Sequence, residues 1–237
     1  MTRTLVCLLA LAPVAVGCTS GATQRAEVFG TEGTASVAFP HPASIGGPDW
    51  KVGDVCTYQF QYGSRKPSVH TQTVSEVSAG RVTLADKGND GSGGNIVLEQ
   101  GGARLRNWIS QADAQRVVFD TALAWVSLPL QPGNTWAVQT AMIGETFQAD
   151  TTATFRAGDW EKVRVPAGEF VSLKVTATLS LVVVNNQGQR NTGTGTWVYW
   201  VTSGTNCMVK QEYGDSFGDK SSRELLSFKT TTPAEPR

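Results

Sequence analysis

The chain offers few side chains for nucleophilic or metal chemistry. Its two histidines are His41, which lies between two prolines, and His70, which lies between Val69 and Thr71. A serine or cysteine nucleophile needs a histidine or a similar base within hydrogen-bonding reach, and nothing near either histidine marks such a partner. Zinc sites need clustered His and Cys side chains, and these histidines are isolated. We therefore expect no catalytic residue, no metal site and no cofactor.

Paired carboxylates are the remaining catalytic pattern, because two acids on separate strands can hydrolyse a glycosidic bond. The acidic residues in the central part of the chain are Glu99, Asp113, Asp120, Glu145 and Asp150. Nothing in their spacing marks any two of them as partners, and solvent-exposed acids on strand faces are the preferred interpretation. An enzyme that acts on envelope polysaccharide stays open as an alternative function.

The glycine-rich run at residues 86–94 invites comparison with ion-binding loops. It reads Asp-Lys-Gly-Asn-Asp-Gly-Ser-Gly-Gly. It lacks the Gly-Lys-Ser/Thr ending of a phosphate-binding loop, and its acidic spacing does not match a calcium loop. We interpret it as a loop between two strands.

Aromatic residues are the more informative set, since the chain has seven tryptophans. On the concave face of a curled sheet, such rings would form an apolar trough suited to a lipid or another hydrophobic ligand. The candidate ligand-binding residues are Trp108, Trp136, Trp197 and Tyr199. The alternative is that these rings fill a β core. Trp197 and Tyr199 alternate with Val198 and Trp200, so aromatic residues lie on both faces of one predicted strand.

Charge and composition exclude one class of partner. Lys plus Arg and Asp plus Glu both number 20, so there is no excess of positive charge for a phosphate backbone. Nucleic acid is therefore not an expected partner.

The first residues predict export. A short positive start precedes an apolar stretch from Leu5 to Val16, and small residues precede Cys18. The stretch is shorter than the roughly 18 to 20 residues that span a bilayer as a helix. Its end resembles the bacterial lipobox, in which the cysteine becomes acylated, although Ala15 stands where leucine is usual. Ordinary secretory cleavage is the alternative.

The lipobox resemblance also implies a destination. Thr19 and Ser20 follow Cys18, and the Asp that retains lipoproteins in the inner membrane is missing. The resemblance therefore implies acyl chains on Cys18 that tether the protein to the outer membrane, facing the periplasm, with the cell surface as the other possible side.

The remaining cysteines predict a disulfide. Cys7 leaves with the signal peptide and Cys18 is the lipidation site, so Cys56 and Cys207 form the available pair in an oxidising compartment. Two buried free thiols are the alternative.

The composition of successive segments predicts the domain organisation. Residues 1–17 are the signal peptide, 18–49 a lipidated cysteine with a flexible linker rich in small residues, 50–230 one β domain and 231–237 a tail. An extended stretch from Phe39 to Pro42 could lie against the domain as a strap. Period-two alternation, most regular from Cys56 to Tyr62, predicts strands throughout the domain. The predicted strands are residues 54–62, 68–78, 81–84, 95–99, 103–109, 115–119, 135–142, 146–156, 169–184, 195–202, 207–213 and 224–229.

Short turns between these strands predict antiparallel neighbours, and a sheet of this many strands curls or closes. The fold class is therefore all-β, an antiparallel meander curled into a half-barrel or barrel. Because Cys56 lies on the first clear strand and Cys207 near the last, closure would bring them together.

Short motifs in the second half support this fold by resemblance. Val163-x-Val165-Pro-Ala-Gly-x-Phe170, with Leu128-Pro-Leu-Gln-Pro-Gly-x-x-Trp136 before it and Trp197-Val-Tyr-Trp200 and Val209-Lys210 after it, resembles a family of uncharacterised proteobacterial envelope proteins. The resemblance covers roughly residues 50–229 and implies the β half-barrel of lipoprotein carriers. It implies no catalytic residue.

The function predicted from these observations is non-enzymatic. We expect a lipid-anchored envelope protein whose barrel binds or shields a hydrophobic ligand or a partner segment. The alternative, with the same envelope location, is a structural or accessory subunit of an envelope assembly. Such a subunit would pair with its partner through an exposed edge strand.

Overall fold

The computed structural model describes residues 39–99, 104–110 and 116–231, and all regular structure in them is β. The twelve strands are β1 (Val55–Tyr62), β2 (Ser68–Ser78), β3 (Arg81–Gly88), β4 (Gly93–Glu99), β5 (Arg104–Ser110), β6 (Arg116–Ala124), β7 (Thr135–Ile143), β8 (Phe147–Val165), β9 (Gly168–Asn185), β10 (Arg190–Val201), β11 (Lys210–Asp215) and β12 (Lys220–Lys229). Each overlaps one of the twelve strands predicted from alternation.

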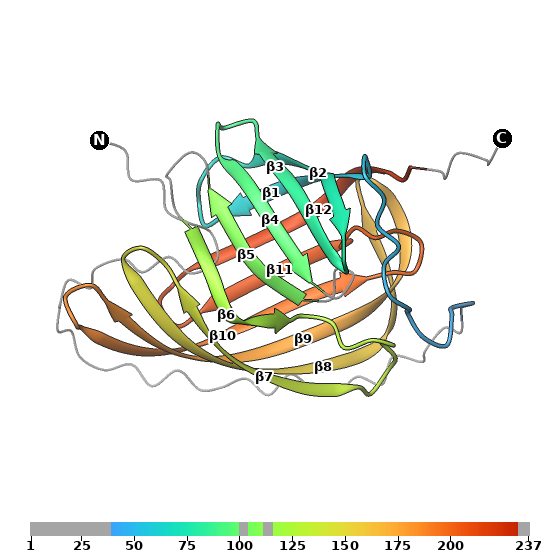
Figure 1. The fold of residues 1–237 in the computed structure, drawn as a ribbon. Coiled ribbons are helices and arrows are strands. Elements are labelled where there is room, and N and C mark those ends of the chain that lie inside the picture. The colour runs from blue at the N-terminus through green and yellow to red at the C-terminus, as the bar shows by residue number, and fades with distance from the viewer. Residues whose placement is uncertain (1–38, 100–103, 111–115, 232–237) are drawn as a thin grey trace.

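The strands form one closed antiparallel barrel in which neighbours in sequence are neighbours in space (Figure 1). The last strand, β12, pairs with the first, β1, and completes the circle. This confirms the predicted all-β antiparallel meander. The sequence left a half-barrel and a barrel open, and the structure is a barrel. In such a meander, alternate connections lie at the same end, which places the β3–β4 connection at the end opposite the β10–β11 connection.

The weakest part of the wall lies between β6 and β7, whose ladder has only two residue pairs, Val118↔Ile143 and Phe119↔Met142. Side chains bridge the rest of this seam. The Trp136 indole donates to the Ala124 carbonyl at 2.9 Å, and the Thr140 hydroxyl donates to the Thr121 carbonyl at 2.6 Å. Backbone groups that lack a ladder partner are thus satisfied by side chains, as buried polar groups require.

The long strands β8 and β9 show how the wall separates core from solvent. Along β8, buried residues alternate with exposed ones from Ala149 to Ala157. On β9, Leu173, Val175 and Ala177 are fully buried against the same core. A period of two places one set of side chains inside the barrel and the other set outside. The two long strands therefore supply much of the hydrophobic core.

Trp200 explains the aromatic residues on both faces of β10. Tyr199 is buried on the inner face, whereas Trp200 lies on the other face and packs in a second cluster with Val163 and Val165 from the end of β8. Its indole donates to Glu161 Oε2 at 2.9 Å. The end of the β8–β9 hairpin therefore supplies the second layer that this strand requires.

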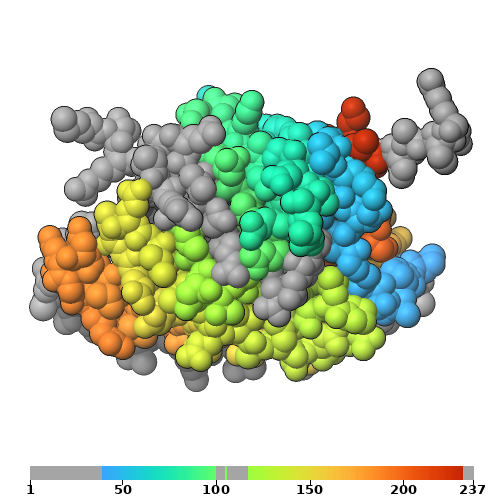
Figure 2. All heavy atoms as spheres, in the orientation of Figure 1, coloured from blue at the N-terminus to red at the C-terminus, as the bar shows by residue number. Residues whose placement is uncertain are grey.

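Residues 39–50, here called the strap, lie against one end of the barrel (Figures 1 and 2). Ile45 is buried and exchanges two backbone hydrogen bonds with Leu130, at 2.7 and 2.9 Å. The His41 ring stacks on Trp160 with centroids 5.2 Å apart. These contacts include the stretch from Phe39 to Pro42 that was foreseen as a strap, and they extend to Ile45 and Trp50 at the end of the segment predicted as a linker. Cys18 and residues 19–38 lie outside the described residues.

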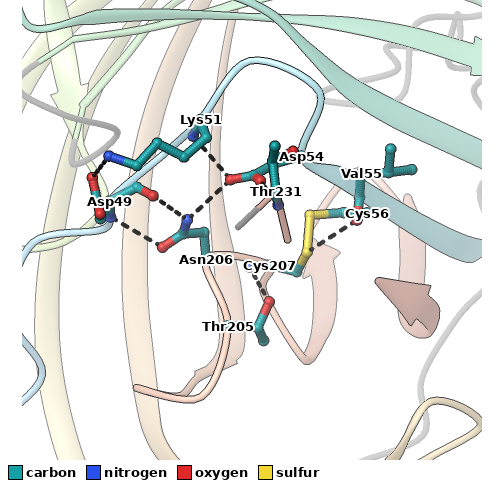
Figure 3. Close-up of a disulfide and its surroundings, with 9 residues drawn as sticks. All are labelled: Asp49, Lys51, Asp54, Val55, Cys56, Thr205, Asn206, Cys207 and Thr231. Atoms are coloured by element: carbon teal, nitrogen blue, oxygen red, sulfur yellow. Dashed lines mark hydrogen bonds and ion pairs between the residues drawn. A yellow bond between two sulfur atoms is a disulfide. The ribbon is translucent and has the colours of Figure 1, made fainter. Parts of the chain in front are cut away.

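The barrel is closed at the strap end by a disulfide between Cys56 and Cys207, as the cysteine count predicts (Figure 3). Cys56 is on β1 and Cys207 lies in the connection between β10 and β11. Their Cα atoms are 5.8 Å apart although 151 positions separate them in sequence. The bond ties the first strand to the connection that precedes the last two.

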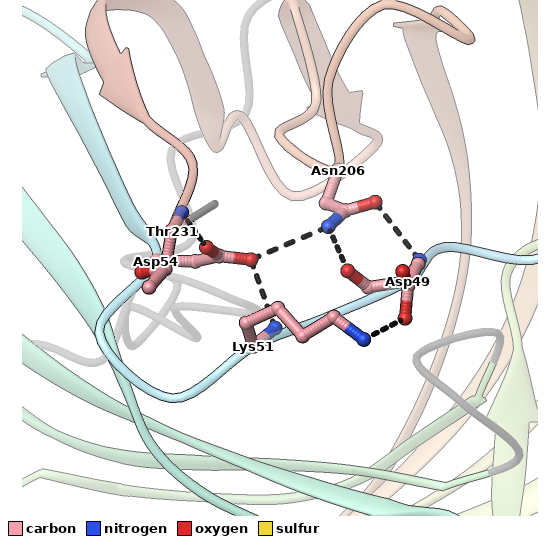
Figure 4. Close-up of polar contacts among 5 residues, drawn as sticks. All are labelled: Asp49, Lys51, Asp54, Asn206 and Thr231. Atoms are coloured by element: carbon pink, nitrogen blue, oxygen red, sulfur yellow. Dashed lines mark hydrogen bonds and ion pairs between the residues drawn. The ribbon is translucent and has the colours of Figure 1, made fainter. Parts of the chain in front are cut away.

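A buried carboxylate reinforces this closure. Asp54 is only 3% exposed. It accepts hydrogen bonds from the backbone N–H groups of Lys51 and Thr231 at 2.9 and 2.6 Å, and Asn206 Nδ2 lies 3.5 Å away (Figure 4). Asn206 in turn exchanges hydrogen bonds with the backbone of Asp49. The strap, the β10–β11 connection and the end of β12 therefore meet at one carboxylate.

Removing the disulfide should destabilise the barrel strongly. We expect the double variant Cys56→Ala/Cys207→Ala to lose about 2–5 kcal/mol of unfolding free energy, because the bond closes a very long loop of the unfolded chain. Urea unfolding of the exported protein measures this loss, and the parent protein in reductant is the control. An unchanged urea midpoint in both would contradict the prediction.

Asp54→Ala should cost about 1–3 kcal/mol, because it leaves buried N–H donors without an acceptor. The matched control is Asp49→Ala, since the Asp49 side chain is 81% exposed and its ion pair with Lys51 lies in solvent. Thermal or urea unfolding compares the two variants. Equal losses would show that the Asp54 carboxylate does not hold the strap end.

Candidate functional site

The inside of the barrel contains a cavity of about 200 Å³. Ten of the sixteen side chains that line it are apolar or aromatic: Trp50, Tyr58, Phe60, Leu84, Ile96, Leu98, Leu105, Trp125, Trp197 and Met208. Six are polar: His70, Gln72, Asp86, Asn206, Gln211 and Arg223. A concave apolar wall with a few converging polar groups is the usual composition of a small-molecule site.

The polar residues occupy neighbouring positions on adjacent strands. Gln211 on β11 pairs with Arg223 on β12, and Arg223 pairs with Phe60 on β1. Gln72 on β2 pairs with Asp86 on β3. The strand register therefore places the polar groups on one side of the cavity wall, from β11 to β3.

Among the lining residues that the structure describes, Arg223 is the one arginine or lysine, and its partners are unusual. Its guanidinium carbon lies 4.9 Å from the centroid of the Tyr58 ring, and Nη2 approaches the Met208 sulfur at 3.2 Å. Its Nε is buried without a hydrogen-bond partner, and no described carboxylate lies within ion-pair distance. Burial raises the pKa of the Tyr58 hydroxyl, and the nearby Arg223 charge opposes that rise.

A chain of hydrogen bonds runs from the cavity wall into the β3–β4 connection. His70 Nδ1 lies 3.0 Å from Asp86 Oδ2, and His70 Nε2 lies 3.3 Å from Ser92 Oγ. Ser92 Oγ in turn donates a very short hydrogen bond to Asp90. The hydrogen bond from Asp86 is the largest cause that raises the pKa of His70, and burial opposes it. We call this set the His70 relay.

The relay has the atom pairs of a Ser-His-Asp triad, which the sequence analysis did not foresee. In a triad, the serine hydroxyl gives its proton to the histidine. Here the hydroxyl donates its proton to the Asp90 carboxylate, so His70 Nε2 is placed as a donor to Ser92 Oγ rather than as its base. The geometry therefore fits a protonated His70 that holds the β3–β4 connection.

Gly93 explains why the connection is glycine-rich at its end. Its φ is +134°, and a Cβ there would lie 2.3 Å from the Asp86 carbonyl oxygen. Any other residue would push β4 away from β3 beside the relay. The run at residues 86–94 is thus a strand connection, as predicted, and Gly93 has a packing role in it.

Ser216 lies in the Gly-x-Ser-x-Gly pattern of a nucleophile elbow but does not have its geometry. Residues 214–218 read Gly-Asp-Ser-Phe-Gly, and they span the end of β11 and the turn that leads to β12. The Ser216 hydroxyl oxygen accepts the Thr194 backbone N–H at 3.0 Å. A nucleophile elbow joins a strand to a helix, and β12 follows here instead.

The four residues proposed for ligand binding occupy different environments. Trp197 lines the cavity. Tyr199 is fully buried behind it, 4.7 Å away between ring centroids, and its hydroxyl donates to the Trp125 carbonyl. Burial raises its pKa well above the usual value. Trp136 stacks on Phe155 at 5.0 Å in the core and does not line the cavity. Trp108 is on β5, and its side chain lies outside the described residues.

The cavity also contains residues that sequence reasoning did not select. His70, Asp86 and Arg223 face the cavity together, because closure brings β12 beside β1, and β2 and β3 follow β1 in the wall. Alternation indicates on which face of its own strand each residue lies. It does not indicate which strands are neighbours in the barrel.

Of the acids considered for glycoside hydrolysis, the four that the structure describes do not line the cavity. Among the described residues that do, Asp86 is the one carboxylate, and it is bonded to His70. Asp120 accepts hydrogen bonds from the Thr140 hydroxyl and the Ala141 backbone at the β6–β7 seam. Glu145 and Asp150 are exposed, and Asp113 lies outside the described residues. No group of three metal-ligating side chains occurs in the described ranges.

No helix capable of crossing a membrane is present in the part of the chain that the structure describes.

Comparison with known proteins places the fold. A candidate lipoprotein of Parabacteroides distasonis superimposes with a TM-score of 0.53 at 14% identity, over 80% of this chain and 100% of that one. A candidate exported protein of Bacteroides fragilis, described as having a YmcC-like fold, gives a TM-score of 0.50 at 14% identity, over 79% and 100%. No family model and no curated protein matches the sequence. The likeness therefore shows a shared fold, that of a class of barrels described as lipoproteins or exported proteins.

The His70 relay should make stability depend on pH. Because the folded pKa of His70 is raised, the relay stabilises the fold fully below the ordinary histidine pKa of about 6.5, and this contribution is lost as pH rises through the raised value. Asp86→Asn should lower the pKa of His70 and lose more unfolding free energy at pH of about 5 than at about 8.

Urea unfolding at the two pH values and an NMR titration of the His70 ring measure these effects. Asp150→Asn, on an exposed position of β8, is the control and should show the same loss at both values. A loss in Asp86→Asn that does not vary with pH would rule out a charged His70 in the relay.

Proposed function

We propose that the protein is a non-enzymatic, lipid-anchored outer-membrane lipoprotein whose barrel interior binds a hydrophobic ligand in the periplasm. The observation that carries the proposal is the cavity itself, in which apolar side chains outnumber polar ones inside a closed wall. A barrel used only as a scaffold gains stability from a filled interior, because cavities cost packing energy. An unfilled apolar space of this size therefore favours binding.

Several independent features support the location. The lipobox-like sequence before Cys18 supports acylation of that cysteine, and Thr19 and Ser20 after it favour delivery to the outer membrane. The Cys56–Cys207 bond suits an oxidising compartment. Proteins of similar fold are described as lipoproteins or exported proteins, which agrees with an envelope location.

The alternative functions receive less support. A partner strand needs an open sheet edge, and the described strands close on themselves. An accessory subunit would therefore bind through side chains, or through the thin β6–β7 seam. A glycoside hydrolase needs two carboxylates flanking the bond, and the described wall of the cavity supplies Asp86 alone.

Filling the cavity should abolish binding without unfolding the protein. Leu98→Trp puts a large ring in the cavity wall, and Val77→Trp, at an exposed position 42% accessible, is the control. With a neutral fluorescent probe such as N-phenylnaphthylamine, we expect saturable binding to the parent and the control, and at least about tenfold weaker binding to Leu98→Trp. Equal binding to all three, or no binding to the parent, would contradict the proposed function.

A further inference from the structure

The guanidinium of Arg223 is the cavity feature that the proposed hydrophobic ligand leaves unexplained. A cation taken out of water into an apolar wall is costly unless an anion or several acceptors meet it. Arg223 meets an aromatic face and a thioether sulfur, both weak partners, and its Nε has none.

Asp86 is the one carboxylate among the described lining residues, and it contacts His70 rather than Arg223. It is 6% exposed, its Oδ2 lies 3.0 Å from His70 Nδ1, and its Oδ1 is buried without a hydrogen-bond partner. The hydrogen bond with Asp86 raises the pKa of His70, and the pair carries no net charge whenever His70 is protonated. In that state the described lining residues carry one net positive charge, that of Arg223, because Gln72, Asn206 and Gln211 are uncharged.

The neighbours of Arg223 add amide donors on one side and apolar surface on the other. Gln211 is its cross-strand partner on β11, and its other partner is Phe60 on β1. The remainder of the lining consists mainly of aliphatic and indole side chains. An acid with two oxygens could accept a forked pair of hydrogen bonds from the guanidinium, while a chain attached to it would lie among those apolar groups.

We propose that the cavity binds an amphiphile with a single anionic head, a carboxylate or a phosphate monoester, whose head pairs with Arg223 and whose chain packs against Leu84, Leu98 and Trp197. This inference rests on the proposed function and names the chemistry of its ligand. The pairing gives the half-buried guanidinium an anionic partner, and the apolar wall around it strengthens the ion pair relative to water. A neutral molecule with the same chain would leave the charge unpaired.

The test compares ligands that have different head groups on an alkyl chain of about the same length. Decanoate, decyl phosphate and decanol compete with the neutral fluorescent probe near neutral pH and below their critical micelle concentrations. For the parent protein we expect at least one acidic compound to bind about tenfold or more tightly than decanol. The two acids distinguish a carboxylate from a phosphate head, and inorganic phosphate alone should not displace the probe.

Variants then assign the selectivity to one side chain. Arg223→Met should reduce the affinity for the preferred acid by about tenfold and leave decanol unchanged. Arg164→Met is the matched control, because that side chain is 84% exposed on the β8 end and should change neither affinity. Arg223→Lys keeps the charge without the fork and should retain part of the preference for the acid.

The outcomes separate the two proposals. Equal affinity of the parent for acids and decanol, or an acid preference that survives in a folded Arg223→Met, overturns this inference and leaves the hydrophobic site standing. Displacement by inorganic phosphate alone also overturns it, since the site would then take a free anion. If the parent binds neither the probe nor decanol nor the acids, the proposed function itself fails. Should Arg223→Met not fold, the acid-to-decanol ratio of the parent and the Arg223→Lys variant decide.

Discussion

The pairing of β1 with β12 is the constraint on which the rest of the molecule depends. Until the last strand meets the first, the meander is an open sheet with two exposed edges and no interior. Closure is secured at the strap end by the Cys56–Cys207 bond and by the Asp54 carboxylate, which joins three distant segments. Non-local contacts of this kind carry a large loop-closure entropy, so covalent and buried polar links at one place are well suited to offset it.

The same closure creates the candidate site. Arg223 on β12, His70 on β2 and Asp86 on β3 line one cavity only because β1 adjoins both β2 and β12. The register then decides which atoms meet, so His70 lies against Asp86, and Arg223 lies over Tyr58 without an anion. The apolar majority of the wall lowers the local dielectric, and this makes the His70–Asp86 contact and the unpartnered Nε of Arg223 energetically significant.

Sequence patterns predicted the fold well because its main determinants are local. Alternation from Cys56 to Tyr62 and along residues 146–156 identifies strands, and short turns identify antiparallel neighbours. The site was predicted poorly for the opposite reason. Trp136, chosen for its ring, packs against Phe155, whereas Arg223 and the His70 relay depend on inter-strand register that no single segment encodes.

The strap illustrates a second limit. Its few apolar residues, such as Ile45, show no period, so composition indicated a free linker, yet each finds a complementary surface on the barrel end.

The antiparallel match of Val55 with Lys229 sets the beginning of the first strand beside the end of the last. Thr231 reinforces this by donating to Asp54 at 2.6 Å. The order of the strands is therefore circular, and the missing connection is the one between β12 and β1. Joining these ends with a short peptide and opening a hairpin turn elsewhere, such as Asn185–Gln189, would leave the cyclic order of all twelve strands unchanged. The barrel is thus a natural scaffold for circular permutation, in which new ends or an inserted reporter could be moved around the rim.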